Sequence, residues 1–556
     1  MRRSPIAALV IALGFATIAN LDRAVAGDPA RPVPLQILAI NDFHGHLEPP
    51  PGSSGRVDSV LAGGAEYLAA HLERARKRQK HTITVSSGDD IGGSPLISGL
   101  FHDEPTLEAF DLMKVEISSV GNHEFDHGPA ELIRLAHGGC PPTETCAKKS
   151  WKGVKMTYLS ANVRRERSGT LLFAPSAIRT FEKIPVAFIG LTLKETPSIV
   201  TKDGTAGLVF EDEVKTVNEE VARLRSRSGV HAFVILLHQG GFVGPGPANS
   251  CNSLTGPLSA IASRLDKDVD LILSAHTHQN YVCRIAGKPV SQSGSFGTVF
   301  ADVRAALDPS TTDFASIKIT NTIATRDIDP TAKMTRLVDK WRVRTKGTGD
   351  QVIGRLSHDV TRATTAAGES ALGNLVTDAQ LAAARESGSP LPQFAVTNPG
   401  GLRADLSFAA RSATRQPGEI TFGELFAAQP FANTLSTVTL SGVDVKTAFE
   451  AQFDNPAPGQ VRVLQVSANV RARYDPGKPA GARVLSLAVD GREVVPTAKY
   501  RVTLNSFLAS GGDAFAPLAS GTDRVELDTD LGALVSYFRA LDQPYAPPPL
   551  GRLSVG

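Results

Sequence analysis

The sequence predicts an α/β protein with two domains. Its 556 residues exceed what a single hydrophobic core usually supports, so two large domains are expected. The apolar run Leu35–Ile40 is followed closely by Asp42 and His44, as in a buried parallel strand with functional residues at its carboxyl end. Short apolar runs then alternate with amphipathic stretches as far as Asp308, which indicates a layered domain with helices outside its sheets.

Hydrophobic periodicity predicts the individual elements of the first domain. Strands are expected at Leu35–Ile40, Thr82–Val85, Thr157–Leu159, Val186–Ile189, Ala232–Leu237 and Leu271–Leu273. Helices are expected at Gly63–Lys80 and Val214–Arg225, because apolar residues recur there at helical spacing.

A basic, helical stretch, Thr331–Lys346, separates this pattern from a second one. We therefore assign residues 33–328 to the first domain, 329–350 to a helical connector and 351–550 to a second, substrate-binding domain. The second domain combines a predicted helix, Ser370–Arg385, with strand-like runs such as Thr434–Leu440 and Val461–Ala468. That mixture predicts an α+β fold for it.

The first 26 residues have the pattern of a removable secretory signal. Arg2 and Arg3 precede an apolar stretch, and Ala24-Val25-Ala26 forms a small-residue cleavage site before Gly27. A membrane anchor is the alternative, but the stretch is shorter than the roughly 20 apolar residues of a spanning helix. We expect a periplasmic or secreted protein with no membrane span after signal removal.

The charge balance argues against one class of partner. Lys plus Arg number 58 and Asp plus Glu number 56, too even for a protein that neutralises long runs of phosphates. We therefore expect a small-molecule substrate rather than a nucleic-acid polymer. Separately, we expect a monomer.

Four cysteines in an exported chain favour two disulfides. The local pairs Cys140–Cys146 and Cys251–Cys283 are the interpretation we prefer among three connectivities. A zinc site is the alternative, but the spacing lacks a Cys-x-x-Cys pair.

Ligand-type side chains gather in five short segments that end or follow predicted strands. They are Asp42-Phe-His44, Ser87-Gly-Asp89, Gly121–Gly128, Leu237-His238 and His276-Thr-His278. Oxygen and imidazole ligands without thiolates suit divalent ions such as Zn²⁺, Mn²⁺ or Co²⁺. Their number suggests two ions about 3.5–4 Å apart with a shared carboxylate, an arrangement that suits phosphoester hydrolysis by a metal-bound water.

These motifs, in this order, resemble the calcineurin-like metallophosphoesterases, in particular the 5′-nucleotidase and UDP-sugar hydrolase branch. Gly121-Asn-His-Glu-Phe-Asp126 is a specific signature, and the similarity spans nearly the whole mature chain. It implies a four-layer first domain, with two packed mixed sheets flanked by helices. It also implies the following roles: Asp42, His44 and His278 bind one ion, Asn122, His238 and His276 the other, Asp89 bridges them, and His123 and Asp126 form a catalytic dyad.

The dyad also makes physical sense from spacing alone. Asp126 lies three residues after His123, where it can select one imidazole tautomer and favour the charged form. His123 could then donate a proton to a phosphoryl oxygen or leaving group. The alternative is that His123 is a further structural ligand. We place His46, Asp90 and His127 outside the set of metal ligands.

The second domain offers candidates for substrate contacts. Arg403 follows the glycine-rich turn Asn398–Gly401 and could bind a phosphate or carboxylate in a fork. Two phenylalanines on separate loops, Phe431 and Phe507, could sandwich a base, although burial in the core is the default for a phenylalanine. The resemblance implies this base clamp, with Arg403, Asn398, Asn433 and Asp513 as further substrate contacts.

Two departures from the family pattern are visible. Ala275 replaces the usual glycine before His276, which should be tolerated if that position needs no positive φ. The branch also commonly has a second substrate-contacting arginine before the helix, where this chain has Thr364–Ser370 with no arginine. Its loss would weaken phosphate recognition by roughly 1.5–3 kcal/mol.

The sequence therefore predicts an exported dimetal phosphohydrolase that converts nucleoside 5′-monophosphates, or related nucleotides, to nucleoside and orthophosphate. Its alternatives on the same site are a UDP-sugar or NAD pyrophosphatase and a 2′,3′-cyclic phosphodiesterase. A nucleotide-binding surface protein without catalysis is a further alternative, which the intact ligand set opposes.

Overall fold

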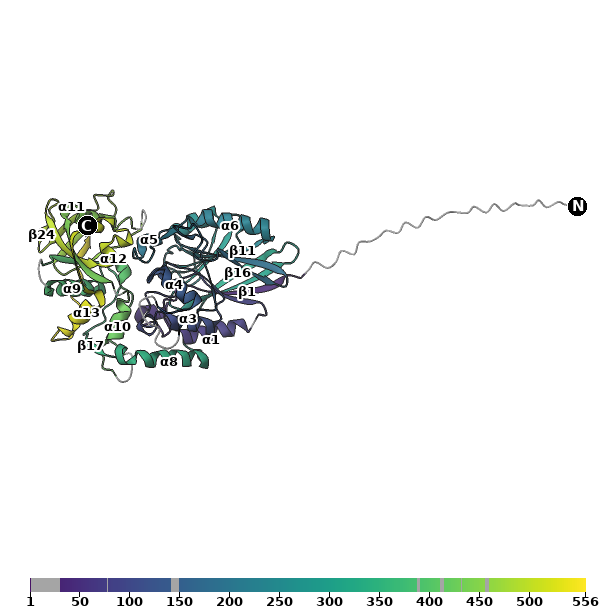
Figure 1. Ribbon diagram of the computed structural model, residues 1–556, viewed down its shortest axis with the longest axis horizontal. Helices are drawn as coiled ribbons and strands as arrows, with labels where there is room; N and C mark the ends of the chain where they lie inside the picture. Colours follow the sequence, from purple (N-terminus) through teal and green to yellow (C-terminus); the bar gives the residue numbers. More distant parts are fainter. Residues whose placement is uncertain are drawn as a thin grey trace.

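The computed structural model describes Met1 and residues 31–556, apart from 78, 142–149, 388–390, 411–414, 432 and 456–459. The chain forms two lobes in sequence order, and helix α8 (Ala332–Gly349) lies along the lower edge where they meet (Figure 1). It contacts helices of the first lobe and α10 (Phe422–Ala428) of the second. The predicted signal at residues 1–26 lies outside the described residues.

The first lobe contains a mixed six-stranded sheet around the strand predicted from Leu35. Strand β1 (Val33–Ile40) pairs in parallel with β4 (Thr82–Ser86) and antiparallel with β15 (Val299–Asp308), so the expected parallel pairing holds on one side only. The order is β16 (Asp313–Ile323), β15, β1, β4, β5 (Ile117–Ser119) and β6 (Thr157–Leu159).

A second six-stranded sheet faces the first. Its order is β13 (Asn280–Ile285), β14 (Lys288–Ser293), β12 (Leu271–Ser274), β11 (Ala232–His238), β9 (Ile184–Thr192) and β8 (Ser176–Phe181). One apolar cluster takes residues from both sheets, including Ile37, Val85 and Val234, and so lies between them.

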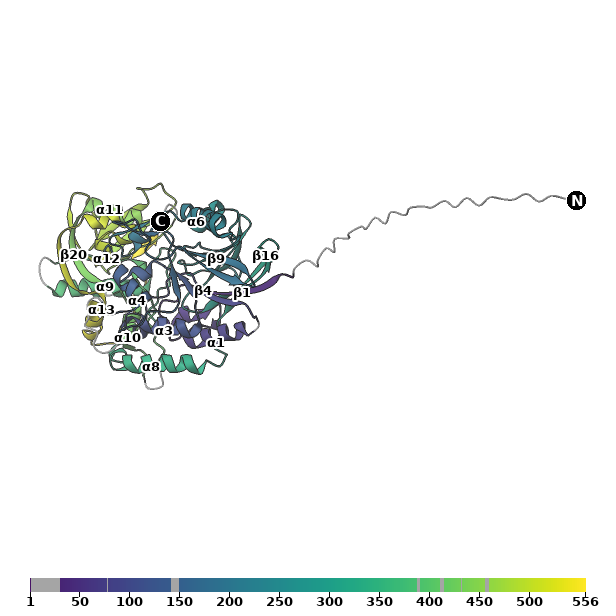
Figure 2. The same ribbon diagram turned by 45° about the vertical axis from the view of Figure 1, so that its right-hand side comes forward.

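Helices cover the outer faces of the two sheets. One further cluster joins the first sheet to α1 (Ala65–Arg76), α3 (Glu104–Met113), α4 (Gly128–His137) and α8. Another joins the second sheet to α6 (Glu213–Ser228) and α7 (Pro257–Arg264). Figure 2 shows α6 on one side of the strands and α1, α3 and α8 on the other. The predicted four-layer arrangement is therefore confirmed.

The second lobe is an α+β domain, as predicted. Its five-stranded sheet has the order β21 (Gln465–Val466), β18 (Phe394–Thr397), β25 (Lys499–Asn505), β20 (Thr434–Ser441) and β26 (Thr522–Thr529). A four-stranded sheet contains β24 (Arg492–Glu493), β23 (Val484–Val489), β22 (Val470–Tyr474) and β27 (Leu553–Val555). The main helices are α9 (Ala371–Glu386), α11 (Gly442–Ala451) and α13 (Asp530–Arg539).

Short elements complete the two lobes. They are β2 (Arg56–Val57), β3 (Val60–Leu61), α2 (Leu96–Gly99), β7 (Val163–Arg165), α5 (Thr196–Ile199), β10 (Leu208–Phe210), β17 (Val352–Arg355), β19 (Glu419–Thr421), α12 (Ser506–Ala509) and the 3₁₀ turns Gly52–Gly55, His123–Phe125, Pro399–Gly401, Gly512–Ala514 and Ala516–Ser520.

The predicted elements are present, with differences at their ends. Helix α1 begins only at Ala65, because Gly63 and Gly64 adopt positive φ angles of 83° and 97°. The prediction of a strand over Val461–Ala468 is wrong for most of its length, since β21 is confined to Gln465–Val466. The backbone N–H groups of Arg462 and Leu464 donate instead to the carbonyl and side-chain oxygens of Gln452.

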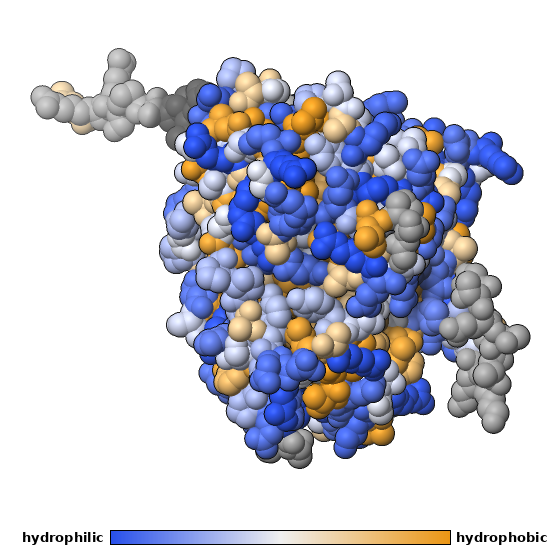
Figure 3. All heavy atoms as spheres, turned by 90° about the vertical axis from the view of Figure 1, so that its left-hand side faces the viewer, coloured by the Kyte–Doolittle hydropathy of each residue, from blue (hydrophilic) through white to orange (hydrophobic). Residues whose placement is uncertain are grey.

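The predicted disulfide between Cys251 and Cys283 is confirmed. Cys140 is also disulfide-bonded, but its predicted partner Cys146 lies outside the described residues. Among the residues described, no helix is both long and apolar enough to cross a membrane. Seen from the side of the second lobe, hydrophilic residues predominate on the surface and hydrophobic ones form small separate patches (Figure 3).

Candidate metal centre

The seven predicted metal ligands lie together at the carboxyl ends of parallel strands and in the turns that follow them. Asp42 and His44 follow β1, Asp89 follows β4, Asn122 follows β5, His238 ends β11, and His276 and His278 follow β12. These strands belong to both sheets of the first lobe, so the ligands meet at one edge of the sandwich.

The backbone turns sharply at most of these positions. Asp42, His44, Asp89, His276 and His278 have positive φ angles of 49°, 48°, 51°, 72° and 55°. Residues other than glycine seldom adopt this region, and each instance costs of order 1–3 kcal/mol. Such strain persists where the surrounding structure enforces it, which is a common feature of binding and catalytic sites.

One group of ligand atoms comprises Asp42, His44 and His278. The two histidine Nε2 atoms are 3.1 Å apart, and His278 Nε2 is 3.6 Å from Asp42 Oδ1. His44 Nδ1 lies 2.8 Å from the carbonyl oxygen of Gly92 and must donate to it, so a neutral His44 has its lone pair on Nε2. Burial lowers the pKa of both histidines well below the usual range, which keeps them neutral.

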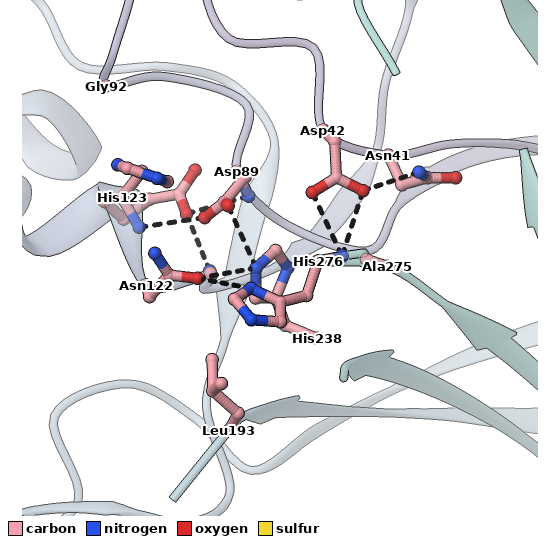
Figure 4. A network of polar contacts seen from close by, with 12 residues as sticks. Asn41, Asp42, Asp89, Gly92, Asn122, His123, Leu193, His238, Ala275 and His276 are labelled. Carbon is pink, nitrogen blue, oxygen red and sulfur yellow. Dashed lines mark hydrogen bonds and ion pairs between the residues drawn. The ribbon is translucent and has the colours of Figure 1, made fainter. Parts of the chain in front are cut away.

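A second group comprises Asp89, His238 and His276, with Asn122 beside them (Figure 4). His238 Nε2 is 3.1 Å from both Asp89 Oδ2 and Asn122 Oδ1, and His276 Nδ1 is 2.9 Å from the same Asn122 oxygen. Asp89 Oδ2 is also 3.7 Å from His44 Nε2, so this carboxylate lies between the two groups.

The second group requires a positive charge at His238 Nε2. His238 Nδ1 donates to the Ser87 carbonyl at 2.8 Å, which would leave the lone pair of a neutral ring facing two oxygens. Burial alone would lower the pKa of His238, but Asp89 and other carboxylates outweigh it and raise the pKa to about 10. A divalent cation among these ligands would supply the same charge, so the residues present fit a metal.

His123 and Asp126, the two residues of the predicted dyad, are in contact. His123 Nδ1 is 2.9 Å from Asp126 Oδ2. Burial opposes the charged imidazole, but Asp126 and Asp89 outweigh it and raise the pKa of His123. The backbone N–H of His123 also donates to Asp89 Oδ1 at 2.8 Å (Figure 4). This hydrogen bond links the dyad to the second group of ligands.

Two of the predicted substrate residues reach the metal centre from the second lobe. Arg403 Nη2 is 3.3 Å from His44 Nε2, and its guanidinium lies 5.7 Å from the ring centre of Phe431. Phe431 stacks on His123, with ring centres 5.6 Å apart and planes inclined by 16°. The two lobes thus meet at the dyad.

The other predicted substrate residues contact residues of the second lobe. Asn398 Nδ2 donates to Asp513 Oδ2 at 2.7 Å, and Phe507 packs closely against Gly512. Asn433 Nδ2 donates to Asp530 Oδ2 at 3.3 Å. The base clamp between Phe431 and Phe507 stays a prediction.

The residues we placed outside the ligand set have other surroundings. The ring of His46 packs against that of Phe296 with centres 4.1 Å apart and planes inclined by 33°. Asp90 accepts hydrogen bonds from the Ser86 and Ser118 hydroxyls, and His127 is exposed. Ala275 is buried and is absent from the described residues with positive φ, which explains why a methyl group fits there.

Sequence reasoning missed Glu124, although it belongs to the Gly-Asn-His-Glu signature. Its carboxylate accepts backbone N–H groups from Asp89 (3.0 Å), Asp90 (2.8 Å) and Gly121 (2.6 Å). It therefore joins the turn that holds Asp89 to the turn that holds Asn122. The sequence signal for this role is an acidic residue inside the motif. Its partners are backbone N–H groups of two separate turns, which only the fold brings together.

We expect Glu124→Ala to lower the free energy of unfolding by at least about 3 kcal/mol, because it leaves three buried N–H donors unsatisfied and each costs about 1–3 kcal/mol. It should also weaken metal binding, because the Asp89 turn loses its anchor. Urea denaturation and metal titration measure the two effects. Glu124→Gln keeps one acceptor oxygen, so its free energy of unfolding should lie between those of the wild type and Glu124→Ala. Equal stability of all three proteins would contradict this role.

Comparison with known proteins agrees with this architecture. Residues 35–280 match the family model of the calcineurin-like phosphoesterases, and residues 352–520 match that of the 5′-nucleotidase C-terminal domain. A crystal structure of a 5′-nucleotidase precursor from Thermus thermophilus superposes with a TM-score of 0.77 and 25% identity, covering 94% of this chain and 99% of that one.

Two bacterial relatives are similar over nearly the whole chain. A cell wall protein of Listeria monocytogenes is 33% identical over 563 residues, covering 96% of this chain and 70% of the relative. The endonuclease YhcR of Bacillus subtilis is 30% identical and covers 95% of this chain, which spans 41% of that protein's length.

Proposed function

Because the chain belongs to the 5′-nucleotidase family, with a calcineurin-like phosphoesterase domain ahead of a 5′-nucleotidase C-terminal domain, we propose that it hydrolyses nucleoside 5′-monophosphates to nucleoside and orthophosphate. It is a metal-dependent phosphoester hydrolase, and its ligand clusters imply divalent metal use. We propose, in addition, a nucleotide substrate, two bound ions and a role for each residue of the site.

Two ions would be held by the two groups described above. Asp42, His44 and His278 would bind one, Asn122, His238 and His276 the other, and Asp89 both. When bound, the ions would neutralise phosphoryl oxygens and generate a nucleophile from water. The observation that carries this assignment is the position of Asp89, whose carboxylate is within 3.7 Å of ligand nitrogens from both groups.

His123 would act as the proton donor. Its Nδ1 is occupied by Asp126, so Nε2 is the ring atom available to a phosphoryl oxygen or to the leaving group. Asp126 and Asp89 favour the charged imidazole, which is the form that can donate. The stacked ring of Phe431 covers one face of His123 and limits access of water to it.

Arg403 would bind the substrate phosphate. Its guanidinium now donates to His44 Nε2, the lone pair that a metal would use. In the described part of the chain it has no carboxylate partner, so its charge is available to an anion.

The direct test is a panel of hydrolysis assays in which the products are separated and identified by chromatography. Metal-stripped protein is reloaded with Zn²⁺, Mn²⁺ or Co²⁺ and given AMP, UDP-glucose, NAD and bis-p-nitrophenyl phosphate. We expect AMP to be hydrolysed fastest and the metal-stripped protein to be inactive. Faster turnover of UDP-glucose or NAD would contradict the proposal and indicate a pyrophosphatase. Faster turnover of the diester would indicate a phosphodiesterase.

Phe507 gives a sharper test of nucleoside recognition, because its ring packs against Gly512 of the second lobe. Phe507→Ala should lower kcat/KM for AMP about tenfold, since base stacking contributes about 1–3 kcal/mol. Ribose 5-phosphate has no base, so its hydrolysis should be unchanged. An equal loss of kcat/KM for both substrates would show that Phe507 stabilises the fold and does not bind the base.

We also propose that the protein is exported to the periplasm or the cell exterior. Its disulfide, its signal-like first 26 residues and its similarity to a cell wall protein support this location. Mass spectrometry of protein from the periplasm or culture medium should find Gly27 as the first residue, and an intact N-terminus on cytoplasmic protein would contradict it.

A further inference from the structure

Gln292 is a glutamine of strand β14 that contacts the turn carrying two of the predicted metal ligands. Its side chain is almost completely buried. Its Oε1 atom accepts the backbone N–H of Gln279 at 2.6 Å, and its Nε2 atom donates to the carbonyl oxygen of Ala275. Ala275 and Gln279 are the residues immediately before and after the segment His276-Thr-His278. One amide group therefore holds both ends of the ligand turn.

The chemistry of these contacts favours an amide at this position. The N–H of Gln279 needs an acceptor and the carbonyl of Ala275 a donor, and a primary amide supplies one of each. A carboxylate would turn an oxygen towards the carbonyl, and an aliphatic side chain would make neither contact. The Thr277 hydroxyl adds to the same network, because its single hydrogen can go to Gln292 Oε1 or to the Gly241 carbonyl, each at 2.8 Å.

The backbone of the ligand turn is strained. His276 and His278 have positive φ angles of 72° and 55°, which residues other than glycine seldom adopt and which persist where neighbouring groups enforce them. Inside the turn, the His276 backbone N–H donates to the Asp42 carboxylate at 3.0 Å (Figure 4). Gln292 supplies hydrogen bonds at the two flanks. The positions of both histidines thus depend on groups outside the turn.

The turn that Gln292 holds serves both groups of ligands. His278 belongs to the first group described above and His276 to the second. The chain that follows His238, another ligand, also passes beside the amide, since a Cβ atom on Gly240 would lie 2.7 Å from Gln292 Nε2. Strand β14 carries none of the seven predicted ligands itself. A displacement of its Gln292 amide would nevertheless move ligands of both groups.

We propose that Gln292 is a positioning residue for metal binding, which fixes His276 and His278 together and so supports both ions. This inference rests on the proposed function, because it assumes that two ions are bound at the two ligand groups. The amide atoms of Gln292 bond backbone groups, so it acts through the two histidines and not on an ion directly. Its loss weakens metal binding at both groups, whereas loss of a residue that only stabilises the core lowers stability alone.

Titration calorimetry with Mn²⁺ tests this without a substrate. Metal-stripped wild type, Gln292→Leu and Gln36→Leu are compared, and elemental analysis gives the number of bound ions. Gln36 is the matched control, because it is a buried glutamine of β1 whose side chain contacts Asp302 and Thr82 and no ligand turn. We expect Gln292→Leu to weaken binding of both ions about 10- to 100-fold, the loss typical of residues that orient metal ligands. Gln36→Leu should lower stability in urea and leave the Mn²⁺ affinity unchanged.

A smaller change covers the case in which leucine prevents folding. Gln292→Asn keeps the amide but is one methylene shorter and cannot reach both backbone partners, so it should weaken Mn²⁺ binding relative to Gln36→Asn. Wild-type affinity in a folded Gln292 variant overturns the proposal, and so does a loss confined to one of the two ions. Failure of the proposed function looks different, because the wild type would then release no phosphate from AMP although its Mn²⁺ affinity still depends on Gln292.

Discussion

Replacing His123 with alanine is expected to lower kcat for AMP hydrolysis by about 100- to 10,000-fold, the range of a positioned general acid. The imidazole is held by Asp126 at 2.9 Å, and its pKa is raised, so it is suited to give a proton to the leaving group. KM should change little, because His123 would act in the transition state rather than in substrate binding. Steady-state kinetics with fully metallated protein measures both quantities.

The control for this variant is His127→Ala, which removes an exposed histidine four residues away and should leave the kinetics unchanged. Metal content, determined by elemental analysis, decides between the two roles considered for His123. A variant that retains its metal and loses kcat supports the dyad. A variant that loses metal in proportion to activity would make His123 a structural ligand instead.

Changing Asp89 to asparagine should have the largest effect on metal binding. The carboxylate lies 3.1 Å from His238 Nε2 and 3.7 Å from His44 Nε2, so it belongs to both ligand groups. Asparagine has the same shape but no charge, and an amide cannot bridge two cations as a carboxylate does. We expect metal affinity to fall by more than about 100-fold, beyond the loss typical of outer-shell partners, and hydrolysis to fall to background.

The fold of this variant can be checked independently of the metal. Asp89 is buried, and although burial alone would raise its pKa, the neighbouring His238, His123 and His44 hold that pKa well below the usual range. Urea denaturation in EDTA should show a folded Asp89→Asn protein, whereas only the wild type should gain stability when metal is added. Equal stabilisation of both proteins by metal would refute the shared role of Asp89.

The sequence alone determined the elements and the ligand chemistry of the first domain. Apolar runs that end in Asp, His and Asn identified β1, β4, β11 and β12, because a buried strand must be apolar and polar side chains can begin only where it reaches the sheet edge. Parallel strands end at the same edge of a sheet, so Asp42 is expected near Asp89 and His238 near His276. The two pairs come from different sheets, and the packing of one sheet on the other brings them together.

Tertiary structure decided what depends on segments far apart in the chain. Glu124 bonds backbone groups of two turns, and Arg462 meets Asp513 across 51 residues. The strand expected from Val461 is shorter because the backbone N–H groups of Arg462 and Leu464 donate to Gln452 rather than to a neighbouring strand. Periodicity describes how one segment divides its residues between core and solvent. It carries no information about which distant backbone or charged group will satisfy a particular hydrogen bond, since only packing of the finished fold fixes those distances.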